Sequence, residues 1–172
     1  KIPFGKPSIG DDEINAVIKV LKSGQLVHGP VTLDFEKQFA KRVGVSYAVS
    51  VSSCTAGLHL SLFINSIGPG DFVAVPAMTH VATAHVVELQ GAKPIFVDVD
   101  PKTGNLDINI LENLARKYPF KAIIPVHYLG LPCDMKELLD VASINDSLII
   151  EDCAHAIDST YDQKKAGSFG YS

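Results

Sequence analysis

A carboxylate at the end of a predicted strand is the residue of this sequence best suited to chemistry. Asp152 follows the apolar run 148–150 and precedes His155 by three positions. In open α/β sheets, ligands bind beyond the carboxyl ends of the strands, so a ligand could reach Asp152. A buried carboxylate is costly without a partner, which lysine, arginine, water or the ring nitrogen of pyridoxal phosphate could supply. The alternative is a helix or turn cap.

A second candidate is the segment 52–57, Ser-Ser-Cys-Thr-Ala-Gly, which follows a predicted strand and begins a predicted helix. Backbone N–H groups and the helix dipole favour an anion at such a helix start. Taken alone, an ordinary N-cap by Ser53 or Thr55 is the more common use of these residues. The segment is neither a P-loop nor a GxGxxG turn, so a phosphate bound here would be a monoester.

Two further predicted strand ends carry histidine. His80 lies in the first turn after one strand, where its ring could stack on a flat cofactor, although a lone histidine is more often an ordinary hydrogen-bonded residue. His127 and Tyr128 follow another strand and could face the same cleft, and a loop packed under neighbouring helices explains them equally well. Because parallel strands end at one edge of a sheet, four such motifs together favour a single ligand site.

Helical and strand patterns alternate along the chain. Apolar spacing predicts helices at about 11–23, 31–43, 55–67, 79–90, 108–118 and 135–145. Short apolar runs, most of them rich in valine and isoleucine, predict strands at 47–51, 72–75, 94–97, 122–124 and 148–150. This order predicts an α/β fold with three layers, a mostly parallel sheet covered by helices on both faces. We expect an N-terminal helical segment at 1–45 and the layered domain at 46–172.

Composition argues against several classes of protein. The formal net charge of −4 and the lack of a basic run argue against nucleic-acid binding. No apolar stretch approaches the roughly 20 residues of a membrane span, and the first residues lack the apolar core of a signal peptide. Three cysteines without a CxxC pair argue against a disulfide framework or a metal site and favour a cytoplasmic location.

Over nearly its whole length the chain resembles the DegT/DnrJ/EryC1/StrS family of sugar aminotransferases. The matching segments are 29–30, 35–36, 53–56, 68–71, 76–83, 91–94, 96–100, 125–127, 151–155 and 167–170. The resemblance implies the large domain of a fold-type I enzyme that depends on pyridoxal 5′-phosphate. It also implies a nucleotide-linked keto-sugar as acceptor, glutamate as amine donor, a homodimer, and a place in nucleotide-sugar biosynthesis.

The resemblance assigns roles at matching positions. The implied cofactor-binding residues are Ser53, Cys54, Thr55, Ala56, His80, Asp152 and His155. Backbone N–H groups of the first segment would hold the phosphate, and His80 would stack on the pyridine ring. Asp152 would pair with the pyridine nitrogen, and His155 would lie near the 3-hydroxyl. Asp158 stands where the family usually has glycine, so the local turn is expected to differ.

In this family the Schiff-base lysine lies downstream of 167–170, past the end of this sequence. We therefore predict no catalytic residue within the 172 residues and expect this chain by itself to be inactive. Two alternatives stay open: a sugar dehydratase of the same family, in which histidine replaces that lysine, and a non-enzymatic regulatory or binding protein on the same fold. A nucleotide-binding doubly wound domain is disfavoured because the glycine-rich fingerprint is missing.

Overall fold

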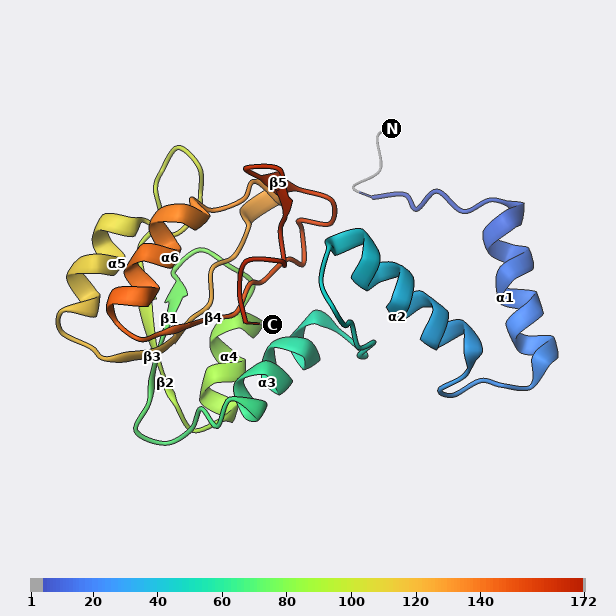
Figure 1. Cartoon of the computed structure of the whole chain (residues 1–172), viewed down its shortest axis with the longest axis horizontal. Coiled ribbons are helices and arrows are strands. Elements are labelled where there is room, and N and C mark those ends of the chain that lie inside the picture. Colours follow the sequence, from blue (N-terminus) through green and yellow to red (C-terminus); the bar gives the residue numbers. More distant parts are fainter. Residues whose placement is uncertain (1–4, 172) are drawn as a thin grey trace. The chain divides into compact units, whose positions relative to one another are not determined.

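The computed structural model describes residues 5–171 and contains two compact units (Figure 1). Unit 1 comprises Lys1–Arg42 with Ser46–Ser50, and unit 2 comprises Val43–Val45 with Val51–Ser172. The expected division of the chain at residue 45 stays a prediction. Within the described residues, no helix is both long and apolar enough to cross a membrane.

Unit 1 is built on two helices, α1 (Asp11–Ser23) and α2 (Pro30–Val43), close to their predicted bounds. Helix α1 begins where the Glu13 carboxylate accepts a hydrogen bond from the backbone N–H of Gly10 at 2.7 Å. It ends at Gly24, whose φ of 71° is left-handed and therefore suits glycine. No residue of α1 is buried, and its apolar side remains exposed.

The predicted strand at 47–51 is wrong. Its short apolar run suggested a strand of the sheet, but Tyr47 and Val49 are 87% and 76% exposed. The Ser50 N–H and hydroxyl both donate to Glu36 Oε1, at 2.8 and 2.5 Å, so a side chain of α2, and not a neighbouring strand, accepts from this backbone N–H. Residues 47–51 therefore form no strand.

Unit 2 is organised around a four-stranded parallel sheet with the order β2-β1-β3-β4. The strands are β1 (Phe72–Pro76), β2 (Lys93–Val97), β3 (Phe120–Ile123) and β4 (Leu148–Ile149). Each matches a predicted strand to within two residues at either end. Because all four strands run the same way, their carboxyl ends share one edge of the sheet.

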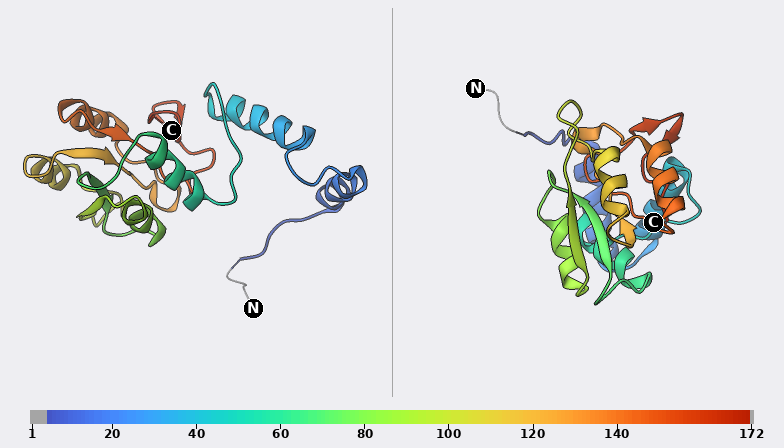
Figure 2. Two further views of the ribbon diagram at one scale, coloured as in Figure 1. Left: turned by 90° about the horizontal axis from the view of Figure 1, so that it is seen from below. Right: turned by 90° about the vertical axis from the view of Figure 1, so that its left-hand side faces the viewer.

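Two apolar clusters place helices on both faces of this sheet (Figure 2). The covering helices are α3 (Cys54–Ile64), α4 (Ala82–Leu89), α5 (Ile108–Ala115) and α6 (Met135–Ile144). Successive side chains of a strand point to opposite faces. Val73 and Val75 accordingly pack with α3 and α4, whereas Ala74 packs with α5 and α6. The predicted three-layer α/β/α fold is confirmed.

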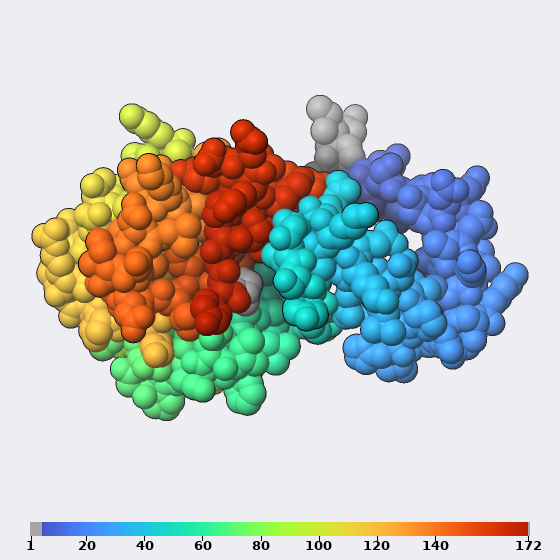
Figure 3. Space-filling view, in the orientation of Figure 1, coloured from blue at the N-terminus to red at the C-terminus, as the bar shows by residue number. Residues whose placement is uncertain are grey.

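A short hairpin near the end of unit 2 was not predicted. It joins β5 (Thr160–Tyr161) to β6 (Lys164–Lys165) and lies at the surface (red in Figure 3). Its turn residues, Asp162 and Gln163, have φ of 46° and 65°, so both are left-handed, as in a type I′ turn. The usual Asn-Gly or Asp-Gly signal is missing, which is why the sequence did not reveal this turn.

Candidate functional site

Asp152 lies at the shared carboxyl edge of the sheet. Its N–H donates to the Pro125 carbonyl at 2.9 Å, and its own carbonyl accepts from the His127 N–H at 3.2 Å. These bonds extend the pairing of β3 and β4 by one bridge, between Val126 and Asp152. The backbone of Asp152 is therefore fixed, and the residue is only 5% exposed.

Three neutral donors surround the Asp152 carboxylate. Oδ1 accepts from the Ala154 N–H at 3.1 Å and from the Cys54 thiol at 3.5 Å, and Oδ2 accepts from the Thr83 hydroxyl at 3.1 Å. The Ala154 bond is the turn cap considered as an alternative, so Asp152 fills that role too. Within residues 5–171 no lysine, arginine or histidine forms an ion pair with it. Because each carboxylate oxygen accepts about two bonds, Oδ2 keeps one acceptor position.

Helix α3 brings its N-terminus to the same carboxylate. Ser53 is its N-cap, and its hydroxyl accepts from the Ala56 N–H at 3.1 Å, so the ordinary capping role is present. The N–H groups of Cys54 and Thr55 donate to no acceptor in the described chain. Free N–H groups in the first turn of an 11-residue helix are a suitable place for a phosphate.

The Cys54 thiol is not a nucleophile in this arrangement. Desolvation by the surrounding protein, followed by the negative charge of Asp152 and their hydrogen bond, raises the pKa of Cys54 to about 11. At neutral pH the sulfur is therefore protonated and serves as a hydrogen-bond donor.

His80 and His155 are not drawn into this cluster by hydrogen bonds. Both residues are exposed, and within residues 5–171 neither side chain bonds to Asp152 or to 53–56. The His80 Nδ1 accepts from the Ala82 N–H at 3.2 Å and so caps the turn before α4. Their expected contacts with a cofactor stay predictions.

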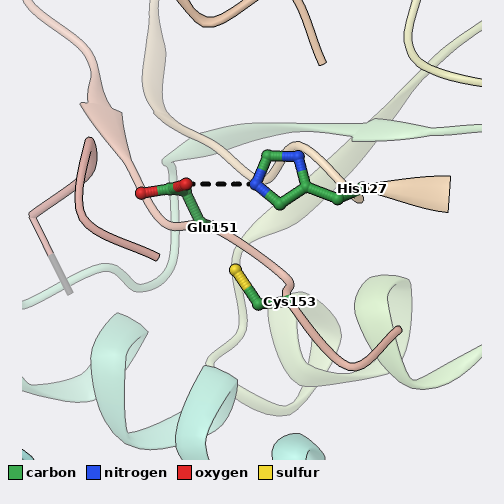
Figure 4. Close-up of side chains that lie close together, drawn as sticks. All are labelled: His127, Glu151 and Cys153. Carbon is green, nitrogen blue, oxygen red and sulfur yellow. Dashed lines mark hydrogen bonds and ion pairs between the residues drawn. The ribbon is translucent and has the colours of Figure 1, made fainter. Parts of the chain in front are cut away.

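Beside this site, His127 and Glu151 point toward one another, with Cys153 nearby (Figure 4). His127 Nε2 and Glu151 Oε2 are 3.0 Å apart, and both side chains are 0% exposed. His127 Nδ1 accepts from the Cys133 N–H at 3.1 Å, so the ring proton sits on Nε2 and is donated to Glu151. The packed-loop interpretation of His127 is therefore the correct one.

Glu151 is saturated with donors. Oε2 also accepts from the Gly167 N–H at 2.8 Å, and Oε1 accepts from the N–H groups of Phe169 and Gly170 at 2.8 and 2.7 Å. Burial by itself would raise the pKa of Glu151, but the bonds from His127 and the three backbone groups outweigh it and lower the pKa. This role of Glu151 could not be predicted from the sequence, because its partners are 16 to 24 positions away along the chain.

Although His127, Glu151 and Cys153 have ligand atoms within 4.8 Å of one another, we expect them not to bind zinc. The Glu151 oxygens and both His127 nitrogens are occupied, and burial and nearby carboxylates raise the pKa of the Cys153 thiol, so no deprotonated ligand is free. Addition of zinc or EDTA should leave the melting temperature unchanged in calorimetry. A zinc-dependent rise that the variant His127→Ala removes would contradict this.

This chain is similar to known proteins of one aminotransferase family. The model of the DegT/DnrJ/EryC1/StrS aminotransferase family matches residues 7–172. An uncharacterised protein of Methanocaldococcus jannaschii is 46% identical over 98% of this chain, and the spore coat polysaccharide biosynthesis protein SpsC of Bacillus subtilis is 43% identical over 98%. A GDP-4-keto-6-deoxymannose-3-dehydratase with a trapped PLP-glutamate geminal diamine superposes with a TM-score of 0.93 at 31% identity, covering 99% of this chain and 45% of its own.

The chain spans less than half the length of these relatives: 44% of the Methanocaldococcus protein and 43% of the Bacillus protein. Several other similar structures are aminotransferases, including one from Psychrobacter cryohalolentis. The similarity of these proteins to this chain therefore includes the sheet, its covering helices and the site around Asp152.

Proposed function

This chain belongs to the DegT/DnrJ/EryC1/StrS aminotransferase family, and we propose that it forms the cofactor-binding part of an aminotransferase that depends on pyridoxal phosphate. Its fold is that of fold-type I enzymes with this cofactor. The observation that carries the proposal is Asp152, a buried carboxylate with a free acceptor position and, in the described residues, no cationic partner. A protonated pyridine nitrogen would supply both the donor and the charge.

The other residues support this placement. The free N–H groups of Cys54 and Thr55, beside the Ser53 hydroxyl that caps the Ala56 N–H, would bind the phosphate. His80 would cover the face of the ring, and His155 would lie near its 3-hydroxyl. When bound, pyridoxal phosphate supplies an electron sink for amine transfer. The contribution of Asp152 is to hold the proton on the ring nitrogen.

We propose glutamate as the amine donor and a nucleotide-linked keto-sugar as the acceptor, in nucleotide-sugar biosynthesis. Support comes from the names of two relatives: one acts on a GDP-linked keto-sugar and holds PLP with glutamate, and another is a polysaccharide biosynthesis protein. The apolar side of α1, exposed in the structure, supports a homodimer. The three free cysteines support the cytoplasm. Within the whole protein we propose a helical segment at 1–45 and part of the cofactor domain at 46–172.

A half-reaction tests the proposal in the full protein. Loaded with pyridoxal phosphate and given glutamate without acceptor, it should release one 2-oxoglutarate per bound cofactor and then stop, because the amine stays on the cofactor until a ketone is added. A keto-sugar nucleotide should restart turnover. Chromatography of 2-oxoglutarate measures both steps. A full protein that binds no pyridoxal phosphate would contradict the proposal and favour the non-enzymatic alternative.

A dehydratase is the second candidate, because the similar structure with a TM-score of 0.93 described above is a dehydratase. The two functions differ in whether a lysine holds the cofactor covalently. Borohydride reduction of the loaded full protein, followed by intact mass, should show a pyridoxyl adduct if it is an aminotransferase. An unmodified mass in a protein that does bind the cofactor would favour the dehydratase.

A further inference from the structure

Two threonine hydroxyls form a chain that ends on Asp152. The Thr83 hydroxyl lies 3.1 Å from Asp152 Oδ2, and the Thr79 hydroxyl lies 2.9 Å from that of Thr83. A carboxylate only accepts, so Thr83 must give its single proton to Asp152. Thr79 must then donate to Thr83. The chain is directed, with each hydroxyl pointing toward the carboxylate.

The local environment of Thr83 does not require this arrangement. A helical threonine ordinarily turns its hydroxyl to a carbonyl three or four residues earlier. The Thr83 N–H bonds to the His80 carbonyl at 3.1 Å, but its hydroxyl instead reaches a residue 69 positions away. Thr83 is 0% exposed, so water cannot replace that bond. In the sequence, the one sign of this role is that Thr83 places a hydroxyl on the buried side of α4, beside Ala84, Val86 and Val87.

We propose that Thr83, supported by Thr79, is a positioning residue that orients Asp152 toward the cofactor ring nitrogen. Thr83 occupies one acceptor position of Oδ2, so the other is held in a fixed direction. Oδ1 is already occupied by Ala154 and Cys54. Chains of hydroxyls also polarise one another, which strengthens each bond at the carboxylate. This inference rests on the proposed function, because it names what Asp152 is held for.

The test compares two isosteric ligands in the full protein. Pyridoxamine 5′-phosphate binds without a covalent bond, and its analogue with carbon in place of the ring nitrogen lacks the N–H that Asp152 would accept. Thr83→Val keeps the shape and removes the hydroxyl, whereas Thr83→Ser keeps the hydroxyl. We expect Thr83→Val to weaken pyridoxamine phosphate binding about tenfold and the carbon analogue little, and Thr83→Ser to bind nearly as the wild type.

A second readout reports the ring proton directly. With 15N-labelled pyridoxamine phosphate, the nitrogen resonance should move toward the unprotonated form in Thr83→Val and less in Thr79→Val. Equal losses for both ligands would overturn the inference, because loosened packing would then explain them. Unchanged affinity in Thr83→Val would also overturn it while leaving the proposed function standing. No binding of pyridoxamine phosphate by the wild type would overturn both.

Discussion

Replacing Glu151 with alanine is expected to lower the free energy of unfolding of unit 2 by about 3–5 kcal/mol, because several buried neutral donors lose their acceptor together. The Glu151 side chain is 0% exposed and accepts four hydrogen bonds, from His127 and from the backbone at 167, 169 and 170. Alanine would leave all four donors buried or half-buried without an acceptor. Domains of ordinary stability have only about 5–15 kcal/mol in total, so the variant should be partly unfolded at modest urea concentrations.

Urea unfolding followed by circular dichroism measures this loss. The matched control is Glu88→Ala, which removes an exposed carboxylate from α4 and should change stability by no more than about 0.5 kcal/mol. Equal stability of the two variants would show that the donors find other acceptors, and the anchoring role of Glu151 would be wrong.

The pH dependence of stability follows from the same carboxylate. Its pKa in the folded protein is lower than its ordinary value of 4.5, so the unfolded chain binds more protons in that range. The contribution of ionised Glu151 to the free energy of unfolding is therefore fully present above pH 4.5. It is lost as the pH falls through the pKa of Glu151 in the folded protein. In Glu151→Gln, which cannot ionise, unfolding measured over the same range should lose this part of the slope. An unchanged slope would contradict the assignment.

Much of the fold could be predicted because its patterns are local. The four parallel strands are short apolar runs bounded by turns, and α1 has one apolar face, acidic residues at its start and Gly24 at its end. The error at 47–51 has the opposite cause. The apolar run in that segment is real, but a strand also needs a neighbour, and the bond from Ser50 to Glu36 is between residues 14 positions apart.

The residues of the candidate site could likewise be predicted only where the signal is local in sequence. Asp152 could be found because a strand, an acid and a turn follow one another in sequence, and the topology then fixes where the strand ends. Thr83 and Glu151 could not, since their importance lies in partners 69 and 16 to 24 positions away. Asp158 was predicted in part, as an aspartate at a position where glycine is usual. Its φ of 67° is the left-handed conformation that glycine favours, and an aspartate tolerates it better than most residues.

Asp152→Asn in the full protein is expected to lower aminotransferase turnover on the order of a thousandfold while the fold persists. The amide keeps the size of the carboxylate. Its oxygen can still accept from the Ala154 N–H, while its NH2 group can donate to the Thr83 hydroxyl, which would have to turn. It has no charge to hold a proton on the ring nitrogen, so the electron sink weakens. Steady-state kinetics with glutamate measure the loss, and thermal melting confirms the fold. Asp140→Asn, an exposed aspartate in α6, is the matched control and should turn over normally. Near-normal turnover in Asp152→Asn would remove the central residue of the proposed function, since an uncharged amide would then serve the cofactor as well as the carboxylate does.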